Sequence, residues 1–146
     1  MTLAPEERLN IVALRLENAD RMLKDAHLLL EAGSLRSAVN RVYYAMFYAA
    51  SALAVSRGRV FSTHKGLIVY LQREFVKTGV LDRQHGRTLQ KAFENRTEGD
   101  YQDLVRFSSA DVARMLSDAE EFVQATTALC RSAESPGPPA ADDVAG

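Results

Sequence analysis

Apolar side chains recur at steps of three and four residues along most of this chain, the pattern of amphipathic helices. The first such stretch covers residues 5–32, where Pro5 suits the first helical turn and Gly33 suits the C-terminal cap. Its expected buried seam consists of Leu9, Val12, Leu16, Ala19, Leu23, Ala26 and Leu30. A last helix is expected to be capped by Ser109, with an equivalent seam of Val112, Leu116, Ala119, Val123 and Thr126.

Three further helices are predicted between these two. Their expected ranges are 34–56, 63–79 and 82–95. Each range opens on a residue whose side chain favours an N-cap, namely Ser34, Thr63 and Asp82. The run from 96 to 101 contains Gly99 and is predicted to be a loop or a broken turn.

No segment alternates with a period of two, so no strand is expected. The fold class is therefore all-α, an antiparallel bundle of four to five helices within residues 1–134. The two helices with heptad-like seams either pair inside this bundle or also form a dimer seam, and both roles are compatible. Residues 135–146 are rich in Pro and Ala and are expected to form a disordered tail.

Charge and cysteine content narrow the class of protein. The 146 residues include 18 Lys and Arg against 19 Asp and Glu. The net charge is therefore close to zero and does not indicate a strongly basic nucleic-acid-binding protein. Cys130 is the single cysteine, which excludes an internal disulfide and a cysteine-rich zinc site. Without a signal-peptide pattern or a membrane span, we expect a cytoplasmic protein, and no metal or cofactor is predicted.

Polar and aromatic side chains interrupt the apolar helix predicted over 34–56. At about 100° per residue, Arg41, Tyr44 and Tyr48 fall together on the flank of its buried stripe, and Asn40 lies one turn from Tyr44. A half-buried guanidinium is costly unless it is paired and hydrogen-bonded. This flank is therefore predicted to bind a polar partner such as a nucleotide or RNA.

A second polar cluster lies at Arg96, Asp100 and Tyr101. One interpretation is a local ion pair between Arg96 and Asp100, which contributes little if it is exposed. The other is that Arg96 and Tyr101 face the helix of Arg41 and Tyr44, forming a groove for phosphates and bases.

Among the three histidines, His64 is the best candidate for chemistry. It follows the expected cap Thr63 at a loop-to-helix junction, where a side chain can face a groove, although a structural role is an equal alternative. His27 is expected to be structural or exposed, and His85 is expected at the surface.

Five segments in order resemble the HEPN domain family, the higher-eukaryote and prokaryote nucleotide-binding domain. They are residues 40–47, 62–66, 75–79, 96–101 and 119–123, within a similarity that covers about residues 8 to 130. The resemblance implies an all-α bundle that usually forms homodimers. It also implies a small partner nucleotidyltransferase encoded alongside and an association with toxin–antitoxin and defence systems.

Many HEPN proteins are metal-independent ribonucleases with an Arg-x4-6-His motif, in which His exchanges a proton and Arg stabilises the phosphorus centre. Arg96 stands at the expected place, but Tyr101 stands where the histidine would be. A tyrosine with a pKa of about 10 is a poor base at neutral pH. The same spacing relates Arg59 to His64 and Arg21 to His27, and a further route combines Arg96 with His64.

The favoured interpretation is a HEPN binding module that engages a nucleotidyltransferase and a nucleotide or RNA through the groove of Asn40, Arg41, Tyr44, Tyr48 and Asp100. The first alternative is a metal-independent ribonuclease toxin with Arg96, His64 and Tyr101 as its catalytic residues. The second is a helical interaction protein without a nucleotide ligand.

Overall fold

The computed structural model describes residues 3–101 and 106–132, with side chains for 3–96 and 106–132. Within these ranges the chain forms five α-helices and one π-helical turn, and no strand. The elements are α1 (Pro5–Glu31), α2 (Leu35–Ser56), α3 (His64–Leu71), η1 (Gln72–Val76), α4 (Arg83–Tyr101) and α5 (Ser109–Ser132). The all-α helical bundle predicted from the hydrophobic pattern is confirmed, whereas the predicted tail over 135–146 lies outside the described residues.

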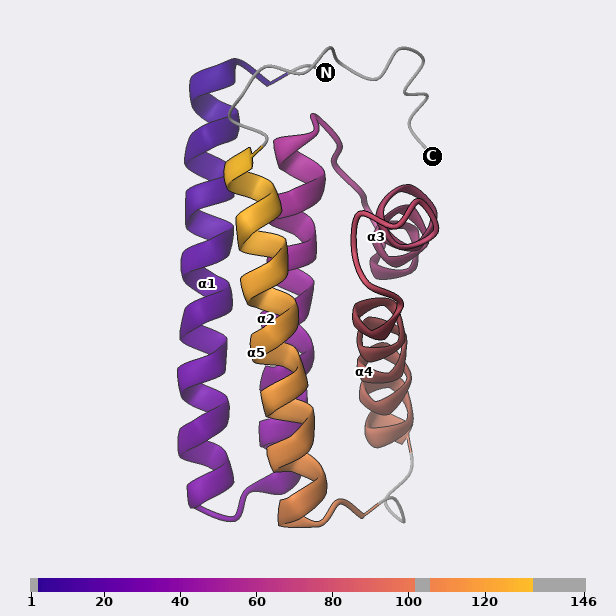
Figure 1. Cartoon of the computed structure of the whole chain (residues 1–146). Coiled ribbons are helices and arrows are strands. Elements are labelled where there is room, and N and C mark those ends of the chain that lie inside the picture. Colours follow the sequence, from indigo (N-terminus) through magenta and orange to yellow (C-terminus); the bar gives the residue numbers. More distant parts are fainter. Residues whose placement is uncertain (1–2, 102–105, 133–146) are drawn as a thin grey trace.

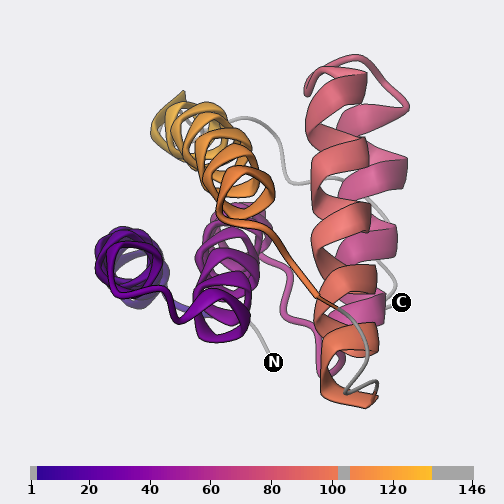
Figure 2. The same cartoon turned by 90° about the horizontal axis from the view of Figure 1, so that it is seen from below.

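Helices α1, α2 and α5 lie lengthwise beside one another, and α3 and α4 form a hairpin that crosses them (Figure 1). Figure 2 looks roughly along α1, α2 and α5 and shows α3 and α4 side by side. Helix α1 runs opposite to α2, but α2 and α5 run in the same direction, so Ala38 and Val39 pack with Val112 near the starts of both helices. The chain returns through the crossing hairpin between them, which explains this departure from a simple antiparallel arrangement.

Helix α2 is the centre of the core. Its second half is buried on several faces at once, and its small residues Ala45, Ala49 and Ala52 have no exposed surface. Alanine at these positions lets neighbouring helices approach closely, and α1, α3, α4 and α5 all pack against α2. None of the helices in the described part of the chain carries an apolar stretch long enough to cross a membrane.

Two of the three predicted caps of the inner helices are confirmed by hydrogen bonds, whereas Ser34 stands at the N-cap of α2 without a side-chain capping hydrogen bond. The Thr63 hydroxyl accepts from the Gly66 N–H at 3.0 Å, and the Asp82 carboxylate accepts from the Gln84 N–H at 2.8 Å. The cap of α5 is Ser108 rather than Ser109: its hydroxyl accepts from the Asp111 N–H at 3.0 Å, while the Asp111 carboxylate accepts from the Ser108 N–H at 3.3 Å. This reciprocal pair is a capping box that starts one residue earlier than predicted.

The loop predicted over 96–101 is wrong, because α4 continues through Tyr101. A glycine inside a helix costs only about 1 kcal/mol relative to alanine, so Gly99 alone does not end α4. Arg96 is also held on α2 by aromatic contacts, which fixes the helix at this point.

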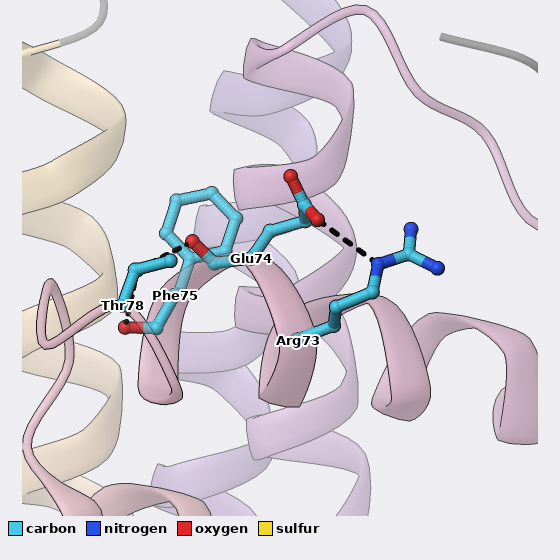
Figure 3. A network of polar contacts seen from close by, with 4 residues as sticks. All are labelled: Arg73, Glu74, Phe75 and Thr78. Carbon is cyan, nitrogen blue, oxygen red and sulfur yellow. Dashed lines mark hydrogen bonds and ion pairs between the residues drawn. The ribbon is translucent and has the colours of Figure 1, made fainter.

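The single helix predicted over 63–79 is divided into α3 and the π-turn η1. A π-turn leaves backbone carbonyls to be satisfied at its end. Figure 3 shows how this is done: the Thr78 hydroxyl donates to the carbonyls of Glu74 and Phe75, at 2.8 and 3.3 Å, while Arg73 pairs with Glu74 at 2.9 Å. The turn ends at Val76, and Gly79 follows three residues later with a positive φ of 84° that suits glycine, as predicted for the end of the 63–79 segment.

Helix α4 approaches η1 most closely at Gly86. The Gln72 side-chain amide donates to the Gly86 carbonyl at 2.8 Å. A Cβ at position 86 would meet the Gln72 Oε1 atom at 2.7 Å and a Val76 methyl at 2.8 Å. The hairpin therefore needs a residue without a side chain at this crossing.

We expect Gly86→Ala to lower the free energy of unfolding by about 1–3 kcal/mol, the usual cost of overpacking, despite alanine's better helix propensity. Chemical denaturation followed by circular dichroism measures the change. Gln90→Ala, at an exposed position of the same helix, is the control and should change stability by less than about 0.5 kcal/mol. Equal or higher stability of Gly86→Ala would show that the hairpin can open at this crossing without cost.

Candidate functional site

Three elements meet where the crossing hairpin lies on α2, and their side chains form a cluster that we call the Arg96 site. It consists of Tyr43, Tyr44, Phe47, His64 and Arg96. The two tyrosines and Phe47 lie within one turn of α2, His64 is the first residue of α3, and Arg96 comes from the last part of α4. Thr63 fixes the start of α3 and so positions His64.

Arg96 lies against both tyrosines. Its guanidinium carbon is 5.3 Å from the ring centroid of Tyr43 and 5.7 Å from that of Tyr44, within the range of cation–π attraction. An Nη2 hydrogen of Arg96 is also donated to the Tyr44 hydroxyl at 3.4 Å. The predicted approach of Arg96 to Tyr44 is therefore present in the structure, although the two residues are 52 positions apart.

His64 is enclosed by the aromatic rings of α2. It stacks on Phe47 with centroids 4.1 Å apart and planes 29° apart, and it meets Tyr44 edge-on at 6.1 Å. Its Nδ1 atom lies 2.8 Å from the Tyr43 hydroxyl oxygen, which makes a short hydrogen bond. His64 and Arg96 thus share the Tyr43 and Tyr44 rings as neighbours, the combination that the sequence left open.

Burial and the Arg96 charge set the protonation states in the site. Burial lowers the pKa of His64 below its ordinary value of 6.5, and the positive charge of Arg96 lowers it further. Burial raises the pKa of Tyr43 to about 12, although Arg96 acts in the opposite direction. At neutral pH the site therefore holds a neutral imidazole and a neutral phenol beside a fixed cation.

The other predicted binding residues occupy different positions. The Arg41 guanidinium donates to the Asn40 amide oxygen at 3.4 Å, so these two residues form a local pair on α2. Tyr48 extends the aromatic row, with its ring 6.3 Å from Tyr44. The side chains of Asp100 and Tyr101 lie outside the described residues, so the proposed Arg96–Asp100 pair stays a prediction.

Tyr43 and Phe47 belong to the site but were not predicted as site residues. Both lie inside a strongly apolar segment, where aromatic residues are ordinarily part of the core, and Tyr43 is fully buried. The signal that identifies them is the phenol: a buried tyrosine hydroxyl needs a polar partner, so Tyr43 marked a polar contact inside the core.

The alternative arginine–histidine spacings do not form comparable pairs. Arg59 is buried with its guanidinium over the rings of Phe61 and Tyr70, at 5.3 and 5.1 Å. Arg21 pairs with Glu17 at 3.3 Å on the surface of α1.

The two remaining histidines have structural or surface contacts. His27 lies 3.2 Å from Glu120 at the surface, as expected for a structural or exposed residue. His85 was expected at the surface, but it is half-buried, with its ring edge-on to Phe122 at 6.1 Å.

A groove of about 540 Å³ lies between α2, α4 and α5. Val42 and Met46 contribute to its apolar lining, and its charged lining is mixed: Arg87, Lys91 and Arg114 stand with Asp111 and Asp118. Within the described part of the chain, no three His, Cys, Asp or Glu side chains come together as a metal site.

Comparison with known proteins identifies the family to which the fold belongs. The model of the HEPN domain matches residues 12–129. A UPF0332 protein of Thermotoga maritima is 42% identical over 123 residues, which cover 84% of this chain and 93% of the relative. A UPF0332 protein of Archaeoglobus fulgidus is 36% identical over 112 residues, or 76% of this chain and 88% of the relative. A protein of Methanocaldococcus jannaschii named "Putative toxin" is 27% identical over 127 residues, or 82% of this chain and 86% of the relative.

The lowered pKa of His64 makes stability depend on pH. Between the folded and unfolded pKa values the unfolded chain binds more protons, so this contribution is complete above pH 6.5 and is lost as the pH falls through the folded value. We expect the free energy of unfolding to fall between pH 7.5 and 5 more steeply in the wild type than in His64→Gln, when measured by urea denaturation. Parallel pH profiles would contradict the environment described for His64.

Proposed function

The chain belongs to the HEPN domain family, and on this premise we propose that it is a binding module for RNA or a nucleotide. The Arg96 site is the proposed phosphate-binding element, with Asn40, Arg41, Tyr48, Asp100 and Tyr101 as further contacts along the flank of α2 and the end of α4. The family membership rests on the match over residues 12–129.

The observation that carries this proposal is the placement of Arg96. Its guanidinium is half-buried and is oriented by contacts with the Tyr43 and Tyr44 rings and with the Tyr44 hydroxyl. A preoriented guanidinium loses little side-chain freedom when it binds a phosphate, and the fork of N–H groups matches phosphate oxygens. The tyrosine rings add surfaces on which a base stacks.

The proposed setting is a toxin–antitoxin or defence-type system. Two relatives from Methanocaldococcus jannaschii have names that include the word toxin, which supports this setting without identifying a partner. We propose that the chain forms a homodimer in the cytoplasm and acts with a small nucleotidyltransferase, because the HEPN resemblance implies both partners.

The second candidate function is a metal-independent ribonuclease. The proximity of His64 and Arg96 around the same two tyrosines favours it, since a neutral histidine and a cation are what cleavage of RNA through its 2′-hydroxyl requires. In this function Arg96 stabilises the phosphorus centre, His64 exchanges the proton, and Tyr101 is a further catalytic candidate.

For the binding function, we expect Arg96→Ala to weaken binding of a single-stranded oligoribonucleotide by about tenfold to a hundredfold, because a charge-assisted hydrogen bond is lost. Fluorescence anisotropy at low salt measures this. Arg83→Ala, at an exposed position of the same helix, is the control and should bind within about twofold of the wild type. Equal binding by both variants would show that Arg96 does not contact the oligonucleotide. No binding by the wild type would favour a helical interaction protein without a nucleotide ligand.

For the nuclease function, cleavage of total RNA should persist in EDTA, and Arg96→Ala and His64→Ala should each slow it by about 10²- to 10⁴-fold. Circular dichroism checks that both variants keep their helical content. Cleavage that survives His64→Ala in a folded protein would exclude His64 as the proton-transfer group. Absence of cleavage by the wild-type protein leaves binding as the function of the site.

A further inference from the structure

The Tyr43 hydroxyl is the only part of that side chain able to form a conventional hydrogen bond, and it is enclosed in the core. Tyr43 has no exposed surface. Among the described residues, the hydrogen bond recorded for its hydroxyl is the one to His64 Nδ1 at 2.8 Å. A buried phenol that does not donate its hydrogen destabilises the folded state, so the direction of this bond matters.

Two observations fix that direction. If Nδ1 carried the proton and Tyr43 accepted it, the phenolic hydrogen would be left in the core without an acceptor among the described contacts. The positive charge of the Arg96 guanidinium, which lies 5.3 Å from the Tyr43 ring, also disfavours the doubly protonated, cationic form of His64. The arrangement with lower energy is therefore Tyr43 donating to an unprotonated Nδ1.

A neutral imidazole whose Nδ1 accepts a hydrogen bond must carry its proton on Nε2. His64 is half-buried, and within the described part of the chain no acceptor is recorded for this Nε2–H. Tyr44 accepts from Arg96, so its own hydroxyl hydrogen remains available for a ligand. The site then offers hydrogen-bond donors from Arg96, His64 and Tyr44.

We propose that Tyr43 is a positioning residue that holds His64 in the Nε2–H tautomer, so that the Arg96 site recognises a phosphate by three donors and does not take a proton from it. This inference rests on the proposed binding function and deepens it. It separates the two candidate functions, because an imidazole held in this tautomer presents no free lone pair for a 2′-hydroxyl proton.

The charges around His64 agree with this assignment. Arg96 approaches from α4 with a permanent positive charge, and Tyr43 and Tyr44 approach from α2 as neutral phenols. These are the titratable or charged groups that the described contacts place against the ring. No carboxylate among them favours a charged imidazolium, and burial and Arg96 both lower the pKa of His64.

The first experiment reads the tautomer directly. In protein labelled with ¹⁵N-histidine, at a pH about two units above the ordinary histidine value of 6.5, ¹⁵N shifts and ring couplings distinguish protonated from unprotonated nitrogens. We expect His64 to show an unprotonated Nδ1 and a protonated Nε2 in the wild type. Tyr43→Phe should redistribute the tautomers and raise the pKa of His64, while Tyr70→Phe, which changes a tyrosine of another aromatic cluster, should change neither. A protonated Nδ1 in the wild type overturns the proposal.

The second experiment tests the phosphate. Wild type and Tyr43→Phe are titrated with an oligouridylate lacking terminal phosphates and, separately, with adenosine monophosphate, to distinguish an internal phosphodiester from a free nucleotide. We expect Tyr43→Phe to bind whichever of the two the wild type binds about two- to tenfold more weakly, as one neutral hydrogen bond is disordered. Unchanged affinity overturns the role of Tyr43.

The two proposals fail in different ways. If the wild type binds neither probe, the proposed binding function fails together with the phosphate part of this inference, whatever the tautomer. If it binds and Arg96→Ala weakens binding but His64 has the opposite tautomer, the binding function stands and only this inference fails. Unchanged thermal stability of Tyr43→Phe excludes partial unfolding as the cause.

Discussion

Burial of α2 on nearly all sides is the constraint on which the rest of the structure depends. Alanines at 45, 49 and 52 let neighbouring helices approach its backbone, and most of its second half is buried. A polar group on such a helix must find its partner on another element, because desolvation without a hydrogen bond is costly. Tyr43 meets this requirement with His64, and Tyr44 meets it with Arg96. The geometry of the site thus follows from the packing of the core.

The electrostatic character of the site follows from one cation among aromatic rings. Arg96 remains charged at every pH of interest, and its contacts described here are with π-faces and a phenol. These contacts orient the guanidinium over the aromatic rings. Burial lowers the pKa of the adjacent His64 imidazole, and the positive charge of Arg96 lowers it further. In the proposed binding function, the cation that binds phosphate is thus the same one that disfavours a second positive charge on His64.

Local signals account for what the sequence predicted well. Pro5 and Gly33 bound α1, and Thr63 and Asp82 cap their helices. The three- and four-residue spacing identifies the seams of α1 and α5, except that Leu9, expected to be buried, is exposed near the start of α1. The approach of Arg96 to Tyr44 was also predicted, because both are polar departures from packing rules. The π-turn, the continuation of α4 past Gly99 and the part played by Tyr43 were not predicted. The continuation of α4 and the part played by Tyr43 depend on contacts between elements distant in sequence, which local propensity does not contain.

The close packing at Gly86 sets the angle between the two arms of the α3–α4 hairpin, and the position of Arg96 depends on that angle. The two arms are held together where Gly86 meets Val76, and His64 and Arg96 lie toward the opposite end of the hairpin. Arg96 is ten residues beyond Gly86, which corresponds to about 15 Å of helix. A tilt of about 5° at the crossing would then displace Arg96 by about 1.3 Å, comparable to the misplacement that disrupts a well-aligned site. A glycine that touches no ligand therefore sets the mechanical precision with which the cation is presented over the aromatic rings.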